Sequence, residues 1–337
     1  MARIALDAMG GDFAPQATVA GALLALADLD PSHSILLVGP TAQVEDALAA
    51  ALAGEQAHLA PHRDRIELVE APDIIEMSEK PSAALRGKPN SSMMRGLRLQ
   101  AEGTADAFVS AGNTGAQMAG SMVILKLHEG LSRPAIATVF PTAKHPVVVL
   151  DSGANVDCSA QELVQFARLG AVYAEDVLGR PNPGVALLNI GEEPEKGSVV
   201  AKEAHQLLRD AGVNFRGNAE GRDILRGQND HGDVDVVVCD GFVGNVVLKF
   251  YESVAPLLVG TLVKEGMDGT KIRHALRHLD YAEVGGAPLL GVKGVSIICH
   301  GKSNPRAIQN ACKAAVRAVE SRMNEHIGRR LASGSAT

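Results

Sequence analysis

Tryptophan is absent from this chain of 337 residues, and aromatic residues make up only 3% of it. Proteins that bind single-stranded nucleic acids stack the bases on aromatic side chains, and this chain has few such platforms. Its formal net charge of -7 at pH 7 also disfavours binding to a phosphate backbone. Composition therefore argues against a nucleic-acid-binding protein, while 46% hydrophobic residues are ample for a sizeable core.

Cysteine is scarce as well. The chain has four, namely Cys158, Cys239, Cys299 and Cys312, and no two of them form a CxxC pair. No secretory signal precedes the first predicted strand, so we expect a cytoplasmic protein with reduced thiols. Asp240 follows Cys239, and a neighbouring carboxylate raises the pKa of a thiol. The sequence therefore favours a buried strand cysteine over a nucleophile, and the spacing of cysteine and histidine predicts no zinc site.

Long apolar runs are also lacking. The run VAPLLVGTLV at 254–263 is shorter than the roughly 20 residues that a membrane span needs, and Pro256 interrupts it. It lies within a helix expected at 244–265. A core or dimer helix is the first interpretation of this segment. The second is a helix that lies in a membrane surface, with Lys249 and Lys264 nearby.

The usual nucleotide-binding fingerprints are missing. No GxGxxG follows the first predicted strand. The segment GGAPLLGVKG resembles a P-loop, but Val292, not a lysine, follows the second glycine of its GxxxxG. The motifs HExxH and GxSxG are absent too. The chain is therefore not expected to use ATP or GTP.

Six strand-like runs each end in a glycine-rich polar turn that opens a predicted helix. They are IALDAMGGD, FVSAGNTG, VVVLDSGAN, ALLNIGEE, VVVCDGFVGN and SIICHGKSN. A parallel sheet places the carboxyl ends of its strands at one edge, where ligands of open α/β sheets bind. Helix N-termini there present free N–H groups that suit an anion such as phosphate. For any single loop, the simpler interpretation is a turn with a helix cap. The occurrence of six such loops favours a shared site. The polar residues of these loops include Asp7, Asn113, Asp151, Asn155, Asp240, Asn245 and His300.

Strand-like and helix-like runs alternate from end to end, which predicts an α/β fold with a mainly parallel, doubly wound sheet. Strands are expected at 4–6, 35–38, 66–69, 107–110, 135–139, 147–150, 185–188, 234–239 and 295–299. Residues 1–330 are expected to form a single domain or two lobes around a cleft, with 180–184 as the best hinge segment. The tail at 331–337 is expected to be disordered.

Three carboxylates stand at predicted strand ends, namely Asp7, Asp151 and Asp240. They are suited to binding Mg²⁺ or to orienting other groups. The alternative, that each caps the following helix, is equally good for any one of them.

A basic segment at 80–98 contrasts with the acidic chain. It contains no acidic residue and five basic ones, namely Lys80, Arg86, Lys88, Arg95 and Arg98. A solvated surface loop and helix is the simpler interpretation. The functional interpretation is docking of an acidic partner, assisted by electrostatic steering.

Nine segments together resemble the bacterial phosphate acyltransferase (PlsX) family over nearly the whole chain. They are IALDAMGGDFAP, EMSEKPSAALRGKPNSSM, SAGNTGA, RPAIAT, LDSGANVD, LNIGEEPEKG, NFRGNAEGRDI, VVVCDGFVGNVVLK and GGAPLLGVKGVSIICHG. The resemblance implies a fold similar to phosphotransacetylases and to the isocitrate/isopropylmalate dehydrogenases, an α/β/α sandwich. It implies transfer of a fatty acyl group from acyl carrier protein to inorganic phosphate, for phospholipid synthesis upstream of glycerol-3-phosphate acylation. It further implies a homodimer at the inner face of the cytoplasmic membrane, with no metal or organic cofactor.

The same resemblance suggests roles for individual residues. Lys196, Asp240 and Asn245 are the expected catalytic residues, with Lys196 as the phosphate or oxyanion partner. The expected substrate and phosphate ligands are Asp7, Asn113, Gly115, Asp151, Gly153 and Asn155. The basic residues Arg86, Lys88, Arg95 and Arg98 are expected to dock acyl carrier protein, and Leu257, Leu258 and Val259 to contact the membrane. Because a thioester is already activated, phosphate is expected to attack it directly.

Other functions remain open on the sequence. A phosphotransacetylase that uses acyl coenzyme A is the nearest alternative, and a membrane scaffold for lipid-synthesis enzymes is one from another class. A nicotinamide dehydrogenase is the fold-level alternative, and the missing dinucleotide fingerprint weighs against it.

Overall fold

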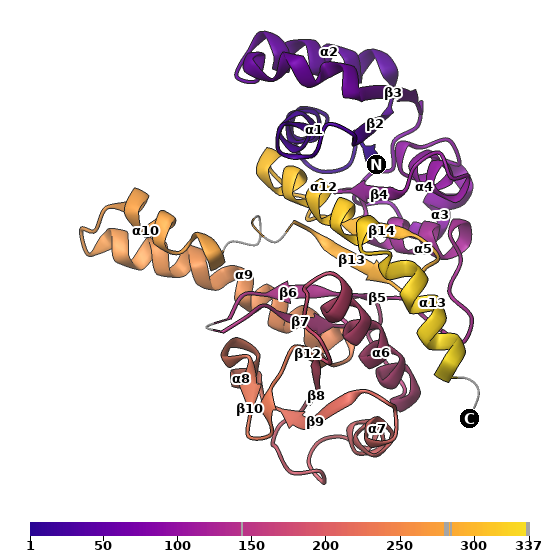
Figure 1. The fold of residues 1–337 in the computed structure, drawn as a ribbon. Helices are drawn as coiled ribbons and strands as arrows, with labels where there is room; N and C mark the ends of the chain where they lie inside the picture. The colour runs from indigo at the N-terminus through magenta and orange to yellow at the C-terminus, as the bar shows by residue number, and fades with distance from the viewer. Residues whose placement is uncertain (143, 280–282, 284, 335–337) are drawn as a thin grey trace. The chain divides into compact units, whose positions relative to one another are not determined.

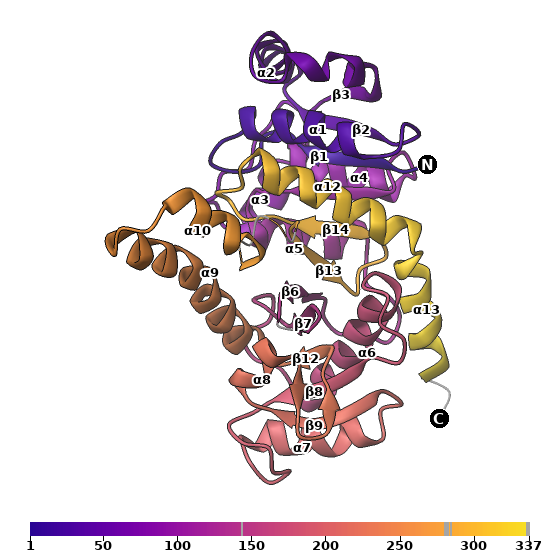
Figure 2. The same cartoon turned by 60° about the vertical axis from the view of Figure 1, so that its left-hand side comes forward.

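The computed structural model describes residues 1–142, 144–279, 283 and 285–334. The chain divides into two compact units (Figures 1 and 2). The first comprises Met1–Leu127 and Val284–Asn324, and the second comprises His128–Glu283 and Glu325–Thr337. Each unit is built around a mainly parallel sheet of its own.

The sheet of the first unit has the order β3-β2-β1-β4-β14-β13. Its neighbouring strands pair in parallel except β13, which is antiparallel to β14. The central strands are fully buried runs of Val, Ile, Leu and Ala, as expected where helices cover both faces. The strands are β1 (Arg3–Asp7), β2 (Ser34–Gly39), β3 (Ile66–Glu70), β4 (Ala107–Ser110), β13 (Ala287–Leu290) and β14 (Val295–Ile298).

Helices α1 (Gln16–Asp28) and α12 (Pro305–Glu320) pack together on one face of this sheet, and α4 (Ser92–Ala101) and α5 (Thr114–Ile124) cover the other (Figure 1). Small residues permit close packing, since a Cβ on Gly21 of α1 would lie 2.5 Å from the Cβ of Ile308. The unit also contains α2 (Thr41–Ala53), the 3-10 helix η1 (Ala57–Arg65) and α3 (Pro81–Gly87).

The sheet of the second unit has the order β6-β7-β12-β8-β9, and only β6 is antiparallel to its neighbour. Its strands are β6 (Thr138–Phe140), β7 (Val147–Leu150), β8 (Gly184–Leu188), β9 (Asn214–Ala219) and β12 (Val236–Val238). This unit also contains β5 (Ala135–Ile136) and a small hairpin of β10 (Gln228–Asn229) and β11 (Gly232–Asp233).

Helices α6 (Ala160–Asp176) and α7 (Val199–Arg209) cover one face of this sheet. The other face carries α8 (Gly221–Arg226) and the first part of α9 (Gly241–Lys264) over an apolar core. In that core the rings of Phe140 and Tyr251 meet edge to face at 5.1 Å. Helix α13 (Met323–Gly334) is tied to the end of α6 by His326, whose Nδ1 lies 2.7 Å from Asp176 Oδ2.

Helix α9 runs away from its sheet, and α10 (Gly269–Ala275) lies against its far part (Figure 2). Among its residues only Gly241, Gly244 and Tyr251 are buried. The run 254–263 was expected to be too short to cross a membrane. The helix that contains it has 24 residues and is long and apolar enough to do so by length and composition, with a mean hydropathy of 1.6 in its most apolar window. No residue of the run 254–263 is buried.

The nine predicted strands all have counterparts, although 135–139 is divided into β5 and β6. Two strands of the large sheets, β9 and β13, were missed, as was the small hairpin of β10 and β11. β9 is polar, with Gly217 at a φ of 71° next to an irregularity in its pairing, and β13 contains Pro288. Within the segment 331–337, which was expected to be a disordered tail, α13 continues to Gly334 and Leu331 is buried. Residues 335–337 lie outside the described residues.

The prediction of a single sheet edge is also wrong. The loops after β1, β4 and β14 belong to the sheet of the first unit, and those after β7, β8 and β12 belong to the sheet of the second. The six loops therefore form two groups of neighbours, one at the carboxyl edge of each sheet.

Candidate active site

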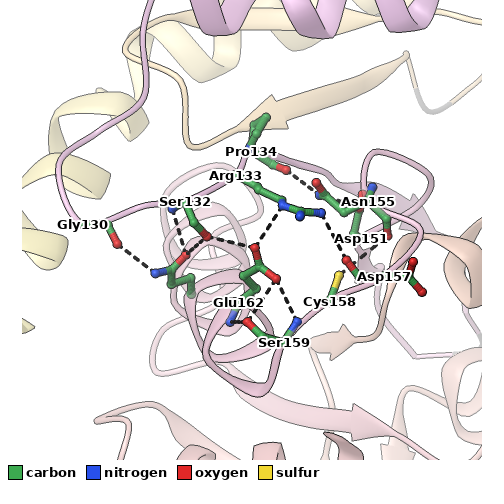
Figure 3. A network of polar contacts seen from close by, with 11 residues as sticks. Gly130, Ser132, Arg133, Pro134, Asp151, Asn155, Asp157, Cys158, Ser159 and Glu162 are labelled. Atoms are coloured by element: carbon green, nitrogen blue, oxygen red, sulfur yellow. Dashed lines mark hydrogen bonds and ion pairs between the residues drawn. The ribbon is translucent and has the colours of Figure 1, made fainter.

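The loop after β7 is organised by the buried carboxylate of Asp151 (Figure 3). Its Oδ1 accepts N–H bonds from Ile136 at 3.0 Å, Gly153 at 3.3 Å and Ala154 at 3.1 Å. Its Oδ2 accepts from the backbone N–H of Asn155 at 2.6 Å and from its side-chain Nδ2 at 2.9 Å. The loop thus forms an anion-binding nest that its own carboxylate fills.

Two opposing effects act on the Asp151 carboxyl. Burial is the larger and raises its pKa, while the N–H donors of the loop favour the ionised form and lower it. The net direction is upward. Since all its partners are N–H groups of the loop and of Ile136, this side chain is committed to the architecture of the loop.

Further contacts anchor the same loop from outside (Figure 3). The Nδ2 of Asn155 donates to the carbonyl of Pro134 at 2.8 Å. Next to it, Arg133 donates to the carbonyl of Asp157 at 3.2 Å and forms an ion pair with Glu162 of α6 at 3.1 Å. The loop is therefore fixed to the segment before β5 and to the first turn of α6.

The N-terminus of α9 packs directly on this loop. The N–H of Gly241 donates to the carbonyl of Asn155 at 2.7 Å. A Cβ on Gly244 would lie 1.9 Å from the carbonyl oxygen of Asp151, so only glycine fits there. Asn245 is exposed, and its side chain lies next to Gly153, where an added Cβ would be 3.6 Å from Asn245 Oδ1.

Asp240 caps α9. Its Oδ1 accepts the N–H of Val243 at 2.8 Å. Of the three carboxylates at strand ends, it alone takes the capping role that the sequence offered as an alternative, because α1 and α6 begin after Pro15 and Ser159. A carboxylate at this N-terminus already interacts favourably with the helix dipole. A phosphate should therefore bind more weakly at α9 than at a helix without an acidic cap.

Such a helix follows the loop after β8. Helix α7 is capped by Ser198, whose hydroxyl accepts the N–H of Ala201 at 3.1 Å, and its first turn has no acidic residue. Lys196 is exposed two residues before this cap. The carbonyl of Lys196 accepts the Nδ2 of Asn189 at 3.1 Å, which closes the loop. Gly197 adopts a φ of 88°, and a Cβ there would collide with Asn189.

Lys196, Asp240 and the Asp151 loop belong to neighbouring positions of one sheet. Strand β12 pairs in parallel with both β7 and β8, so the loops that follow the three strands leave the same edge. The structure therefore brings the expected catalytic loops to one edge of the second unit. Sequence reasoning missed Asn189 and Ser198 there. Ser198 could have been predicted as the cap, because a serine directly before an apolar run is typical of a helix N-terminus.

The remaining predicted ligands lie in the first unit. Asp7 is buried, accepts the hydroxyl of Ser110 at 2.7 Å, and lies beneath Gly10, where a Cβ would be 2.8 Å from its Oδ2. Burial is the largest influence on Asp7 and raises its pKa. Ser110 was not singled out from the sequence, since a serine at the end of an apolar strand has no distinctive pattern.

Asn113 caps α5 by accepting the N–H of Ala116 at 3.0 Å. Its Nδ2 donates to three carbonyl groups of the segment before α3, those of Glu76, Met77 and Glu79. Gly115 packs against Pro81, which a Cβ would approach to 2.6 Å. These residues hold α3 against α5, so the side chain of Asn113 bonds to backbone groups of the first unit.

The thiols are poor nucleophiles. Cys239 is buried at the end of β12, as predicted, and burial together with Asp240 and Asp151 raises its pKa well above the ordinary value. Burial also raises the pKa of Cys158 to about 12. Cys299 and Cys312 are buried with raised pKa values too. Each of the four thiols is therefore protonated at neutral pH.

The basic segment is partly neutralised by its surroundings. The Nζ of Lys88 lies 2.5 Å from Glu79 Oε1, and this hydrogen bond lowers the pKa of Glu79. Arg98 donates to the carbonyl of Pro89, Arg86 donates to a carbonyl within α3, and Arg95 lies 4.0 Å from Glu102. Lys88 and Arg95 are thus paired with carboxylates, whereas Arg86 and Arg98 keep their uncompensated positive charge.

No group of three or more His, Cys, Asp or Glu side chains suited to a metal ion occurs among the residues that the structure describes.

Comparison with known proteins agrees with this architecture. A family model described as "Fatty acid synthesis protein" matches residues 2–326. The chain is 48% identical over 330 residues to a phosphate acyltransferase of Desulforamulus reducens, covering 95% of this chain and 94% of the relative. It is 47% identical over 341 residues to a phosphate acyltransferase of Heliobacterium modesticaldum, covering 96% of this chain and 97% of the relative.

Solved structures show the same fold at low sequence identity. The EutD phosphotransacetylase of Staphylococcus aureus matches with a TM-score of 0.63 and 16% identity, over 94% of both chains. A phosphotransacetylase of Streptococcus pyogenes matches with a TM-score of 0.62 and 16% identity, over 95% of this chain and 94% of that one. The predicted α/β sandwich of the phosphotransacetylase type is confirmed. The chain belongs to the phosphate acyltransferase family and is an enzyme that transfers an acyl group to phosphate.

Proposed function

We propose that this acyltransferase takes a fatty acyl group from acyl carrier protein, passes it to inorganic phosphate and thereby supplies acyl phosphate for phospholipid synthesis. A glycerol-3-phosphate acyltransferase would consume this product. The observation that carries the proposal is the loop after β8, which presents the exposed Lys196 just before the N-terminus of α7. An ammonium group and a helix N-terminus whose first turn has no acidic residue both favour a bound phosphate. Glu192, Glu193 and Glu195 of the same loop oppose it.

The chemistry needs no protein nucleophile. An oxygen of hydrogen phosphate attacks the thioester carbon, a C–O bond forms, and the C–S bond breaks. The proton of hydrogen phosphate ends on the departing thiolate, so that the products are acyl phosphate and the free thiol of the carrier. In this scheme Lys196 holds the phosphate or the developing oxyanion, and Asn245 orients the phosphate or the pantetheine arm. The protonated state of the four thiols is consistent with direct attack.

Helix α9 supports a second part of the proposal, a contact with a membrane or with a second copy of the chain. Its exposed apolar side chains include Phe250 at 72% and Leu257 at 67% exposure. Leu258 is exposed as well, and α9 contains few charged residues in this region. A surface of this kind usually marks a protein or membrane contact. We infer a homodimer that associates peripherally with the cytoplasmic membrane from the cytoplasmic side.

The donor is tested by comparing kcat/KM for long-chain acyl carrier protein and for acyl coenzyme A. A double variant, Arg95→Glu with Arg98→Glu, should lower kcat/KM for the carrier protein and leave that for acyl coenzyme A unchanged. Arg209→Glu, on the exposed end of α7, is the matched charge reversal and should affect neither donor. A wild-type enzyme that uses only acyl coenzyme A would move the protein to the phosphotransacetylase alternative. Failure with both donors would favour the scaffold.

A further inference from the structure

The Asp151 side chain is a heavily hydrogen-bonded carboxylate of the second unit, and the proposed chemistry leaves it without a role. Its two oxygens accept five N–H bonds, three at Oδ1 and two at Oδ2. A carboxylate has about four lone-pair directions, so the group is saturated. It is also fully buried. A phosphate ion therefore has no place to bind on this side chain.

The loop that Asp151 orders contacts the first turn of α9. This loop supplies the Asn155 carbonyl that accepts the N–H of Gly241 at 2.7 Å. The carbonyl of Asp151 itself occupies the space beside Gly244. Both contacts fall in the first turn of α9, immediately before Asn245.

Asn245 is in turn placed by the loop. The α-carbon of Gly153 lies next to the side chain of Asn245. A Cβ built on Gly153 would lie 3.6 Å from Oδ1 and 3.7 Å from Cβ of Asn245. Gly153 also has a φ of 133°, which a residue with a side chain rarely adopts. The N–H of this same glycine is one of the five that Asp151 holds.

We propose that Asp151 is a positioning residue, which fills the nest of its own loop and thereby sets the place of Asn245, and that it does not bind phosphate. The inference rests on the proposed function in that Asn245 is taken to orient the reactants. It assigns the phosphate to the Lys196 loop and leaves the Asp151 loop as a preformed support.

A double-mutant cycle tests the link. Asp151→Asn puts an NH₂ group among N–H donors and displaces the loop, and a shift of about 1 Å at a reacting group costs about 100-fold in rate. If Asp151 acts through Asn245, the pair Asp151→Asn and Asn245→Ala should be no slower than Asn245→Ala alone. Multiplying losses would overturn the proposal.

A matched control is available in the same unit. Asp223 is also a buried carboxylate that accepts a backbone N–H, that of Glu220 at 2.9 Å, but it does so as the third residue of α8, in the capping box of that helix. Asp223→Asn should lower the melting temperature and leave kcat within about twofold of the wild type, and its small effect should multiply with that of Asn245→Ala. An equal loss of kcat in both aspartate variants would reduce Asp151 to a general structural role and contradict the proposal.

A second pair of measurements serves if Asp151→Asn folds poorly. Gly153→Ala keeps the carboxylate but strains the loop backbone beside Asn245, because alanine rarely adopts a φ of 133°. It should slow the wild type and have no further effect in Asn245→Ala. Asp151→Ala empties the nest, and formate should raise the melting temperature and kcat of this variant only, while chloride at equal ionic strength should do neither. No formate response would contradict a preformed nest. A wild type that forms no acyl phosphate would instead reject the proposed function, because the thermal response to formate does not depend on activity.

Discussion

The carbonyl oxygen of Asp151 lies 1.9 Å from the position that a Cβ on Gly244 would occupy. No rotamer change relieves such a contact, because the obstacle is backbone. The first turn of α9 and the loop after β7 therefore fit together only with glycine at this position.

Gly244→Ala should separate these two elements. We expect a loss of about 1–3 kcal/mol of stability, the usual cost of overpacking, together with a reduced kcat. Thermal unfolding and acyl phosphate formation measure the two effects. Gly260→Ala is the matched control, because nothing lies within 4 Å of a Cβ there. It should stabilise α9 by up to about 1 kcal/mol through helix propensity. Equal behaviour of the two variants would contradict the packing described.

Lys196→Ala should lower kcat by roughly 100-fold to 1,000-fold, the usual effect of removing one group that stabilises developing charge. Lys196→Arg should retain part of the activity because the charge remains. The fold should be unaffected, since the side chain is exposed. Steady-state kinetics measured at varied phosphate concentration test this, with the exposed Lys202→Ala of α7 as the control. Unchanged activity in Lys196→Ala would remove the main site assignment.

Cys239→Ala should keep kcat within about threefold of the wild type, because a thiol with a raised pKa is not the nucleophile. Its stability should fall by about 1 kcal/mol from the small cavity. The enzyme should also resist inactivation by iodoacetamide at pH 7. Loss of turnover in a correctly folded Cys239→Ala protein would argue for an acyl-enzyme and against direct attack by phosphate.

Asp7 predicts a pH dependence of stability. Its pKa in the folded protein is raised above the ordinary value of 3.8, so the unfolded chain releases its proton first as the pH rises. Stability contributed by protonated Asp7 is therefore complete below about pH 4 and declines until the pH passes the folded pKa. Asp7→Asn should gain stability relative to the wild type between pH 4 and pH 7. The exposed Asp12→Asn in the same loop is the control, and a parallel pH profile for Asp7→Asn and wild type would contradict the shift.

Leu258→Glu should weaken self-association or binding to anionic vesicles without lowering the melting temperature, because this side chain is 39% exposed. Analytical ultracentrifugation and liposome flotation distinguish the two contacts. Leu225→Glu is the control, since Leu225 of α8 is also an exposed leucine of the second unit. Wild-type behaviour of Leu258→Glu in both assays would leave α9 without the proposed contacts.

The sequence predicted the layers better than it predicted the grouping of the loops. Apolar strands such as β1 and β7 are buried on both faces. Consecutive apolar residues such as Val, Ile and Leu indicate this kind of burial in the sequence itself. Whether β7 joins the sheet of β1 or begins another depends on pairing between strands distant in the chain, which local pattern does not encode. Polar β9 was missed for the same reason, since its pairing with β8 compensates for weak local propensity.

The site divides in a similar way. Strand-end polar residues were found from their positions, but Asn113 and Asp151 proved to use their polar atoms on the chain itself. A sequence marks which residues stand at a strand end, and only the folded geometry shows which of them still face outward. Lys196 does so, and the proposed function depends on it.

The most direct measurement is formation of acyl phosphate, trapped as a hydroxamate with hydroxylamine, from long-chain acyl carrier protein without added metal or nucleotide. We predict that the hydroxamate forms in proportion to added inorganic phosphate and that Lys196→Ala abolishes most of it. Hydroxamate formed equally well without phosphate, or none formed with it, would contradict acyl transfer from carrier protein to phosphate by this enzyme.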